Sequence, residues 1–386
     1  MAPVGGVLPE RARWTSAVFG PERRACANRD VCAIGILPGE GIGPEVIETA
    51  LGLLPAIERE TGLRFDLRTG GKIGRDAERL TGRPLPDDVV AFCESVFEAG
   101  GAILAGPGGG RFVYELRRRF DLFCKISPII VSEAFVSVGR LKPAAVRGTD
   151  MLLVRENSGG AYFGESRESR TPEDGRLCEH AFRYGEREIR RIIEIGAKLA
   201  HQRRRQLTVV VKDGGLPALT ALWRETAEDV ATRAGLRASF VNIDLAAYQL
   251  IQYPRNFDVV VADNLFGDVL ADVAAVLLGA RGFSYSGNFS ASGAAVYQTN
   301  HGGAVDIAGE DRANPIGQIQ ALGMMLRESF GLSREAAWVE QAVDEVLRQG
   351  FRTFDVAGEG SSVVGTREMG DRIASAVERI ARSYRE

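Results

Sequence analysis

The sequence predicts an α/β fold in which a central, largely parallel or mixed sheet is flanked by helices. Apolar runs of strand length alternate with stretches of helical periodicity, as expected for a sheet built from crossover connections. Several of these runs end in glycine, which is typical of tight turns after buried strands. At 386 residues the chain is near the size at which one hydrophobic core gives way to two, so we expect two lobes.

The first buried strand is predicted at 31–37, where VCAIGIL precedes a proline and two glycines. An amphipathic stretch from Pro44 then indicates a strand, a turn and a helix in succession. Further apolar runs predict strands within 100–110, 151–157, 207–215 and 257–264. Helical periodicity predicts helices at 86–98, 184–203, 217–234, 268–279, 314–330 and 335–349.

Two segments do not fit this alternation. Residues 1–31 mix arginines with acidic residues and contain no apolar run long enough for a signal core or a membrane span. We expect them to form a poorly ordered extension. The polar stretch 164–180 indicates an excursion from the compact body, which is either an arm that reaches a second subunit or a mobile surface loop.

Charge and cysteine content limit the partners and the compartment. A formal net charge of -3 gives no strong field for nucleic acid or an anionic membrane, so a small-molecule partner is expected. The cysteines are odd in number and lack the spacing of a metal site, which favours a reducing, cytoplasmic compartment. They are Cys26, Cys32, Cys93, Cys124 and Cys178.

Asp268 and Asp272 are the first candidates for chemistry. Apolar residues at helical spacing around them place both carboxylates on one helix face, one turn apart. A hard cation such as Mg²⁺ or Mn²⁺ would reverse their repulsion and leave coordination positions open for a hydroxy acid. A solvated acidic face is the alternative.

The other candidates are weak when taken alone. The glycine-bearing segment 301–315 leads into a helix and could present amide groups to a phosphate, but it lacks GxGxxG, and turns are the simpler interpretation. Arg155 and Tyr162 follow a predicted strand, and Lys212 ends another. Taken alone, the simpler interpretation is a strand end with a turn and a packed tyrosine, and a solvated lysine, although a lysine near a metal could act as a base.

Taken together and in order, these segments resemble the isopropylmalate/isocitrate dehydrogenase family of metal-dependent, β-decarboxylating dehydrogenases. The resemblance covers about residues 32–380. It rests on LPGEGIGPEV (37–46), ELRRRFDLF (115–123), VRENSGGAYFG (154–164), FVNIDLAAYQLI (240–251), DNLFGDVLAD (263–272) and HGGAVDIAGEDRANP (301–315).

The resemblance implies a homodimer of two-lobed subunits. One discontinuous, cofactor-binding lobe would comprise 32–122 and 280–386, and the inserted lobe would comprise 123–279. A dimerisation arm at about 161–184 would project from the inserted lobe. The active site would lie in the cleft between the lobes and be shared between subunits.

The resemblance also implies the roles of individual residues. A divalent cation, Mg²⁺ or Mn²⁺, would be held by two aspartates of one subunit and one of its partner. The ligands are Asp268, Asp272 and, from the partner, Asp244. Arg117 and Arg155 would bind substrate carboxylates, a role suited to the planar guanidinium group. Tyr162 and Lys212 would be the acid and the base, with Asp244 beside them in the catalytic set.

The cofactor implied is NAD. The stretch from His301 and Gly302 to Asn314 resembles the family's adenosine-binding loop, and Asp306 falls where members that prefer NAD carry an aspartate. A carboxylate there accepts a hydrogen bond from a ribose 2′-hydroxyl and repels a 2′-phosphate. Gln298 stands where the family usually places a glutamate near the nicotinamide.

Departures from the family pattern cluster around the substrate. Ser127 replaces an arginine of the NLRP-like segment, and Lys125 on the same strand face offers a charge from a different angle. Val113, followed by Tyr114, replaces a leucine that usually contacts the substrate's branched tail, and the KDGG segment after Lys212 carries an apparent insertion. Catalysis is therefore expected to be retained and recognition altered.

The sequence thus predicts NAD- and metal-dependent oxidative decarboxylation of a 3-substituted malate, within the wider class of hydroxy di- or tricarboxylic acids. Isocitrate, homoisocitrate and tartrate are alternative substrates. A catalytically silent regulatory or scaffold subunit is the alternative from another class, because Ser127, Gln298 and the KDGG segment depart from the pattern. An oxidation that stops at the keto acid is a third. The C3 substituent and the pathway stay open.

Overall fold

The computed structural model describes residues 12–19 and 31–384. A ten-stranded sheet runs through the molecule in the order β2-β1-β3-β12-β11-β4-β5-β10-β8-β9. Its strands are β1 (Val31–Leu37), β2 (Arg64–Thr69), β3 (Ala102–Ala105), β4 (Cys124–Ile130), β5 (Asp150–Glu156), β8 (Leu207–Val211), β9 (Ala238–Asn242), β10 (Val259–Ala262), β11 (Tyr285–Phe289) and β12 (Ala295–Thr299).

Parallel pairs dominate both ends of this sheet, and the antiparallel pairs lie at its centre, where β12, β11, β4 and β5 meet. The predicted α/β class with a largely parallel or mixed sheet is confirmed. The buried strands are continuous apolar runs, as in VVVA of β10, because helices cover both sheet faces.

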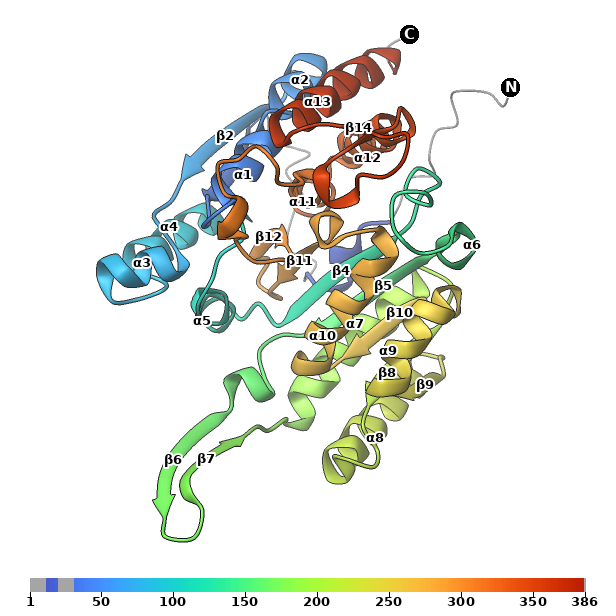
Figure 1. Cartoon of the computed structure of the whole chain (residues 1–386). Coiled ribbons are helices and arrows are strands. Elements are labelled where there is room, and N and C mark those ends of the chain that lie inside the picture. The colour runs from blue at the N-terminus through green and yellow to red at the C-terminus, as the bar shows by residue number, and fades with distance from the viewer. Residues whose placement is uncertain (1–11, 20–30, 385–386) are drawn as a thin grey trace.

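Helices lie on both faces of the sheet (Figure 1). Each packs through an apolar stripe, as α7 does through Ile189, Ile192 and Ile193, whereas α11 is buried along its whole length. They are α1 (Gly43–Leu51), α2 (Leu54–Thr61), α3 (Gly74–Thr81), α4 (Asp87–Glu98), α5 (Phe112–Arg119), α6 (Pro143–Val146), α7 (Glu186–His201), α8 (Pro217–Arg233), α9 (Ile243–Gln252), α10 (Asn264–Ala275), α11 (Ile316–Glu328), α12 (Ser333–Arg348) and α13 (Thr366–Ser383).

The chain divides the sheet between two groups of elements. Segments 31–105 and 285–299 supply β1, β2, β3, β11 and β12, while segment 124–262 supplies β4, β5 and β8 to β10. Figure 1 shows α1, α2, α12 and α13 with the first group and α7 to α9 with the second. We keep the division into a discontinuous lobe, 32–122 with 280–386, and an inserted lobe, 123–279, as a proposal.

Helix α10 starts earlier than predicted. The expected helix 268–279 is observed at 264–275, because the Asp263 side chain accepts a hydrogen bond from the backbone N–H of Phe266 and caps the helix there. Residues 276–278 form a separate 3₁₀ turn before Gly279. The shift moves Asp268 from the first residue of the predicted helix to the second turn of the observed one.

Part of the amino-terminal extension is packed against the body, so the expectation of poor order is wrong for 12–19. Trp14 is 3% exposed and lies under the guanidinium of Arg327, and the Thr15 hydroxyl and backbone N–H donate to Glu328 at the end of α11. Burial of an indole ring and a satisfied carboxylate holds this segment in place. The rest of the extension, 1–11 and 20–30, lies outside the described residues.

The polar stretch after Tyr162 forms a hairpin that projects from the body (Figure 1). Its strands β6 (Glu165–Thr171) and β7 (Gly175–Ala181) pair with each other in antiparallel register, and almost all of their residues are exposed. A second small pair joins β13 (Phe351–Arg352) to β14 (Ser362–Val363). Among the residues described, no helix combines the length and apolar character needed to cross a membrane.

Candidate active site

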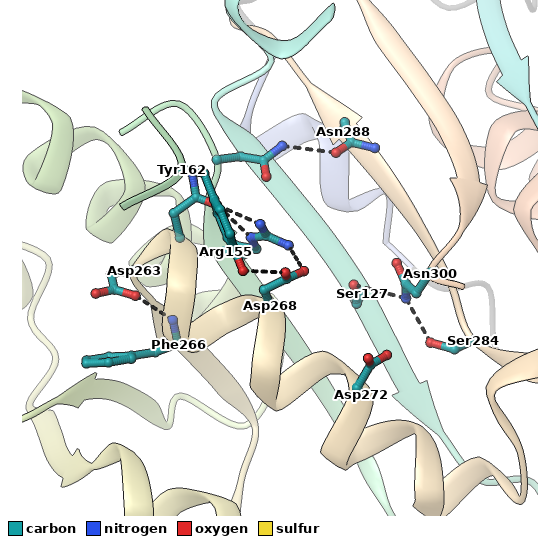
Figure 2. A network of polar contacts seen from close by, with 12 residues as sticks. Ser127, Arg155, Tyr162, Asp263, Phe266, Asp268, Asp272, Ser284, Asn288 and Asn300 are labelled. Atoms are coloured by element: carbon teal, nitrogen blue, oxygen red, sulfur yellow. Dashed lines mark hydrogen bonds and ion pairs between the residues drawn. The ribbon is translucent and has the colours of Figure 1, made fainter. Parts of the chain in front are cut away.

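Helix α10 presents two carboxylates from successive turns. Asp268 and Asp272 are four residues apart, so they lie on one face of the helix, and their side chains are 42% and 50% exposed. A ligand can therefore reach both carboxylates. Figure 2 shows them pointing toward the central strands of the sheet.

Asp268 is the centre of a polar network (Figure 2). Its Oδ2 accepts a hydrogen bond of 2.7 Å from the Tyr162 hydroxyl, and its Oδ1 forms an ion pair with Arg155. Burial opposes ionisation of Asp268, but Arg155, the Tyr162 hydroxyl and Lys125 outweigh it and lower the pKa of this carboxyl. Asp268 is therefore an anion at neutral pH.

Tyr162 is in a position to hold and release a proton. It lies in the short 3₁₀ turn Ala161–Phe163, between the end of β5 and the hairpin. Burial and the hydrogen bond to Asp268 raise its pKa. The phenol therefore keeps its proton at neutral pH, as a general acid must.

Three buried cations face the two carboxylates. Arg155 and Lys125 are partners in the antiparallel register of β5 and β4, and Arg117 comes from the last turn of α5. Asn264 holds the Arg155 guanidinium with hydrogen bonds of 3.0 and 2.6 Å.

The electrostatics of these cations favour an anionic ligand. Burial and Arg155 lower the pKa of Arg117 to about 9, and burial with the two arginines lowers that of Lys125 well below its usual range. Nε of Arg117 is buried without a hydrogen-bond partner. A bound carboxylate would offset the mutual repulsion of the cations and supply the missing acceptor.

The part of the sheet beside the cations, at β4, β11 and β12, carries neutral polar side chains and forms the floor of the site. Ser127, two residues after Lys125 on β4, lies 3.5 Å from the amide nitrogen of Asn300, which also donates to the Ser284 hydroxyl at 2.8 Å. Figure 2 shows Ser127 between Asp268 and Asn300. At the position where the resemblance suggested an arginine, the site is therefore uncharged.

Asp272 forms a two-point ion pair with Arg281, with distances of 3.0 and 3.2 Å. Both side chains are about half exposed, 50% and 57% respectively, so this pair adds little stability. A cation that binds Asp272 would displace Arg281 from the carboxylate.

The expected base and third metal ligand lie elsewhere in the chain. Lys212 ends β8 and Asp244 is in the first turn of α9, and the two side chains form an ion pair of 3.0 Å. The hydrogen bond from Lys212 lowers the pKa of Asp244. Within residues 12–19 and 31–384, no group of three or more histidine, cysteine or acidic side chains could hold a metal.

Most of the predicted cofactor residues lie in the loop between β12 and α11. His301, Gly302 and Asp306 lie between β12 and α11, and Asp306 is exposed in a 3₁₀ turn. Nε2 of His301 is buried without a partner. Asn314 receives a hydrogen bond from the backbone N–H of Ile316 at the start of α11 and donates to Asp355.

The loop before α11 is held in place by the turn that follows β1. The backbone N–H of Ile42 donates to the Gly303 carbonyl at 2.8 Å, which brings the turn after β1 against the predicted adenosine loop. Gln298 lies on β12, opposite Ser286 of β11. The exposed carboxylate of Asp306 and the free nitrogen of His301 fit a ribose hydroxyl and a polar ligand group.

Val113 is half-buried on α5, and its neighbour Tyr114 forms an aromatic cluster over the site. The Tyr114 ring is 5.2 Å from the Tyr162 ring, centroid to centroid, and the guanidinium groups of Arg111 and Arg117 each lie 5.4 Å from its centroid. This wall is aromatic and cationic rather than aliphatic.

Several residues of this site were not identified from the sequence, among them Asn264, Arg281, Ser286, Asn288 and Asn300. Asn264 carried a weak signal, because it follows a buried strand directly. The others lie on or beside β11 and β12, whose short mixed runs gave no clear strand pattern.

The donor set fits a hard divalent cation. Asp268 and Asp272 offer carboxylate oxygens from one helix face, and both are open to a ligand. Mg²⁺ and Mn²⁺ prefer such oxygens and commonly keep few protein ligands. The soft ligands of a structural zinc site have no counterpart among the described residues, because Cys32, Cys93 and Cys124 are separately buried.

The chain matches known proteins over most of its length. A family model described as isocitrate/isopropylmalate dehydrogenase matches residues 33–373. The 3-isopropylmalate dehydrogenase of Aquifex aeolicus is 36% identical over 364 residues, which are 91% of this chain and 98% of that protein. That of Methylococcus capsulatus is 39% identical over 362 residues, 90% of this chain and 99% of that protein.

A solved structure gives the same result. The crystal structure of isocitrate dehydrogenase from Methylococcus capsulatus superposes with a TM-score of 0.80 at 30% identity, over 90% of this chain and 99% of that one. The similar proteins thus differ in the substrate that they are named for.

Proposed function

This chain belongs to the isocitrate/isopropylmalate dehydrogenase family, and from that premise we propose that it oxidises and decarboxylates a 3-substituted malate of the 3-isopropylmalate type. It is therefore a decarboxylating hydroxy-acid dehydrogenase. The observation that carries the substrate class is the group of three buried cations, Arg117, Arg155 and Lys125, beside Asp268 and the Tyr162 hydroxyl.

Substrate carboxylates bind to the buried cations in this proposal. Arg117 has an unused Nε donor, and Arg155 is fixed in orientation by Asn264. Lys125 takes the role that an arginine at 127 would otherwise have. Three cations suit a substrate with at least two carboxylates, because a single carboxylate would leave most of the buried charge unpaired.

The divalent cation, Mg²⁺ or Mn²⁺, would be held by Asp268 and Asp272 with Asp244 of a second copy, while NAD would lie along His301, Gly302, Asp306, Asn314 and Gln298. When bound, the metal polarises the substrate's C2 oxygen and NAD accepts the hydride. The exposed carboxylate of Asp306 favours NAD over a cofactor with a 2′-phosphate.

Two protein groups would move protons. Lys212 of a second copy would accept the proton of the C2 hydroxyl once its amine is neutral. Its side chain lies 3.0 Å from Asp244 in the same chain, so the two side chains would enter the shared site together. After loss of CO₂, the Tyr162 hydroxyl donates a proton to C3. Its position beside Asp268, to which the protonated hydroxyl donates, supports this role.

A homodimer with shared sites is part of the proposal. The β6–β7 hairpin is exposed on both faces, and an isolated two-stranded hairpin is only marginally stable in water, which supports its being covered by a second copy. In one chain Asp244 is paired with Lys212, away from the pair on α10. A reducing cytoplasm remains a proposal that follows from the cysteine pattern.

The experiment is a substrate screen that follows NADH absorbance and CO₂ release. It covers isopropylmalate, isocitrate, homoisocitrate, tartrate and alkyl-substituted malates, with Mn²⁺ and with a chelator. We expect metal-dependent turnover of at least one of them, abolished by Asp268→Asn and retained by the exposed control Asp87→Asn. NADH formation without CO₂ would limit the reaction to oxidation.

The silent regulatory subunit remains the alternative, because Ser127 and Gln298 depart from the family pattern. The regulatory alternative would be favoured if no acid of the screen were turned over. It would also be favoured if the only turnover observed were not reduced by Asp268→Asn. The ionised Asp268 and the proton-bearing Tyr162 speak for an active enzyme.

A further inference from the structure

The floor of the site contains a neutral patch formed by Ser127, Ser286 and Asn300. In the antiparallel pairing of β11 with β4, Gly287 lies opposite Ile126, so Ser286 comes opposite Ser127 on the same sheet face. Ser286 is also the partner of Gln298 in the pairing of β11 with β12. Asn300 follows β12 and reaches the Ser127 hydroxyl at 3.5 Å.

Two atoms of this patch are buried without partners. The Ser286 side chain is 0% exposed, and its hydroxyl oxygen has no hydrogen-bond partner. Asn300 is half-buried, and its Oδ1 atom is buried without a hydrogen-bond partner. Buried polar groups are rarely left unpaired, because desolvation without a hydrogen bond is costly. The patch is therefore built to meet another polar group.

The contacts of Asn300 fix what that group must offer. Its amide nitrogen donates to the Tyr285 carbonyl at 3.1 Å and to the Ser284 hydroxyl at 2.8 Å. Since a backbone carbonyl only accepts, the amide orientation is set, and Oδ1 is an acceptor that needs a donor. The hydroxyls of Ser127 and Ser286 can donate in return.

The patch adjoins the catalytic centre but carries no charge. Lys125 precedes Ser127 by two residues on the same face and lies beside Arg155. Figure 2 places Ser127 between Asp268 and Asn300, with Asp272 nearby. The cations thus gather at one end of the floor and the neutral groups at the other.

We propose that Ser127, Ser286 and Asn300 form a subsite for a hydroxyl group carried on C3 of the malate substrate or on its C3 substituent. The inference rests on the proposed function and narrows its substrate class. A hydroxyl both donates to Asn300 Oδ1 and accepts from a serine. An alkyl substituent leaves those atoms unpaired, and a carboxylate meets the Asn300 acceptor without a cation among the three residues of the patch.

One other group has the same chemistry, namely the carboxamide of nicotinamide, which also donates and accepts. Gln298, the residue expected near the nicotinamide, lies next to Ser286 on the neighbouring strand. The position of Ser127 two residues from Lys125 favours the substrate. The experiment below therefore separates the two sources.

The test compares pairs of substrates that differ only in hydroxyl and methyl groups. Tartrate is compared with 3-methylmalate, and 3-(hydroxymethyl)malate with 3-ethylmalate, by kcat/KM with saturating NAD and Mn²⁺. We expect the hydroxyl member of at least one pair to be preferred by about tenfold or more. Ser127→Ala with Asn300→Leu should remove that preference, and Ser95→Ala, an exposed serine of α4, should keep it.

Each outcome bears on one claim. A preference for the methyl members overturns the inference, and so does a ratio of kcat/KM values near one, which a water-filled subsite would give. In both cases turnover itself upholds the proposed function. No turnover of any malate removes the proposed function instead. If the double variant weakens NAD binding measured by NADH fluorescence but leaves the substrate ratio unchanged, the carboxamide is the occupant and the substrate assignment is wrong.

Discussion

At the scale of single residues, Asp268 joins the groups that the chemistry needs. It accepts from Tyr162, pairs with Arg155 and lies one helical turn from Asp272. Because it stays ionised beside buried cations, a metal and a carboxylate substrate can bind next to each other without leaving buried charge of one sign. The hydroxyl proton of Tyr162 also points to Asp268, because the hydroxyl donates to this carboxylate.

Tyr162→Phe isolates the proposed proton donor. The ring and its packing against Tyr114 remain, but the hydroxyl that donates to Asp268 is lost. We expect kcat to fall by about 10²–10⁴-fold, while KM changes little, because the cations that bind substrate are untouched. Steady-state kinetics with the best substrate of the screen measure this, with the exposed Tyr253→Phe as control. An unchanged kcat would exclude Tyr162 as the donor.

At the scale of elements, two local devices hold the site together. Asp263 caps α10 and so sets where Asp268 and Asp272 fall on the helix. The segment Trp14–Ala17 packs against the end of α11, which precedes α12 in the first group of elements. Both depend on buried polar groups, so both can be tested by measuring stability.

Asp263→Asn should change how stability depends on pH. Burial raises the pKa of Asp263 to about 6, so the folded chain holds this proton more tightly than the unfolded chain. Between about pH 4 and pH 6 the free energy of unfolding therefore falls as pH rises. Asparagine keeps the cap without the charge.

We therefore expect the free energies of unfolding of the variant and the wild type to differ by a constant amount below about pH 4. By about pH 7 the variant should have gained about 2–3 kcal/mol of unfolding free energy relative to the wild type. Urea unfolding at several pH values measures the difference. A difference that does not vary with pH would show that Asp263 is ionised at no cost in the fold.

Thr15→Val tests the docked amino-terminal segment. Valine has the shape of threonine but cannot donate to the Glu328 carboxylate, which is 0% exposed. The loss should cost about 1–3 kcal/mol of unfolding free energy, because a buried carboxylate keeps fewer donors. Ser16→Ala, on the exposed side of the same turn, should have almost no effect in the same urea titration. Equal effects of the two substitutions would count against a specific contact.

At the scale of the whole molecule, the chain separates the expected halves of one site. The α10 carboxylates lie at the central strands, whereas Lys212 and Asp244 lie at β8 and α9, toward the far edge of the sheet. A symmetric dimer can bring the second pair of one copy to the first pair of the other. This arrangement stays a prediction, since it depends on a second chain.

Mixing Lys212→Ala and Asp268→Asn chains tests that prediction. Each variant alone should be inactive, but a mixed dimer has one intact site and one site that carries both changes. Random pairing should therefore restore roughly a quarter of the wild-type activity. Co-expression and an assay of the unfractionated mixture measure it, and the mixed dimer isolated through two different tags should show roughly half of the wild-type activity. Mixed dimers as inactive as the parents would place both groups in one chain's site.

The elements that the sequence predicted well are those whose pattern is set by burial alone. β1, β5, β8 and β10 are uninterrupted apolar runs between helices, and α4, α7, α8 and α12 carry regular apolar stripes. β11 and β12 were missed because residues such as Ser286 and Asn288 interrupt the apolar pattern. α13 was missed although its stripe is regular, since arginines and acids dominate its exposed face.

By itself, the sequence determined the fold class and the chemistry within reach of single segments: two carboxylates on one helix face, an arginine and a tyrosine after a strand, and Asp306 in a glycine-bearing segment before a helix. Such features depend on spacing along the chain. The tertiary structure alone decided that Lys125 and Arg155 are strand partners, that Ser286 is unpaired near Ser127 and Asn300, and that Trp14 is buried. These are contacts between strands and segments far apart in the chain, and strand pairing and desolvation, rather than local propensity, bring them about.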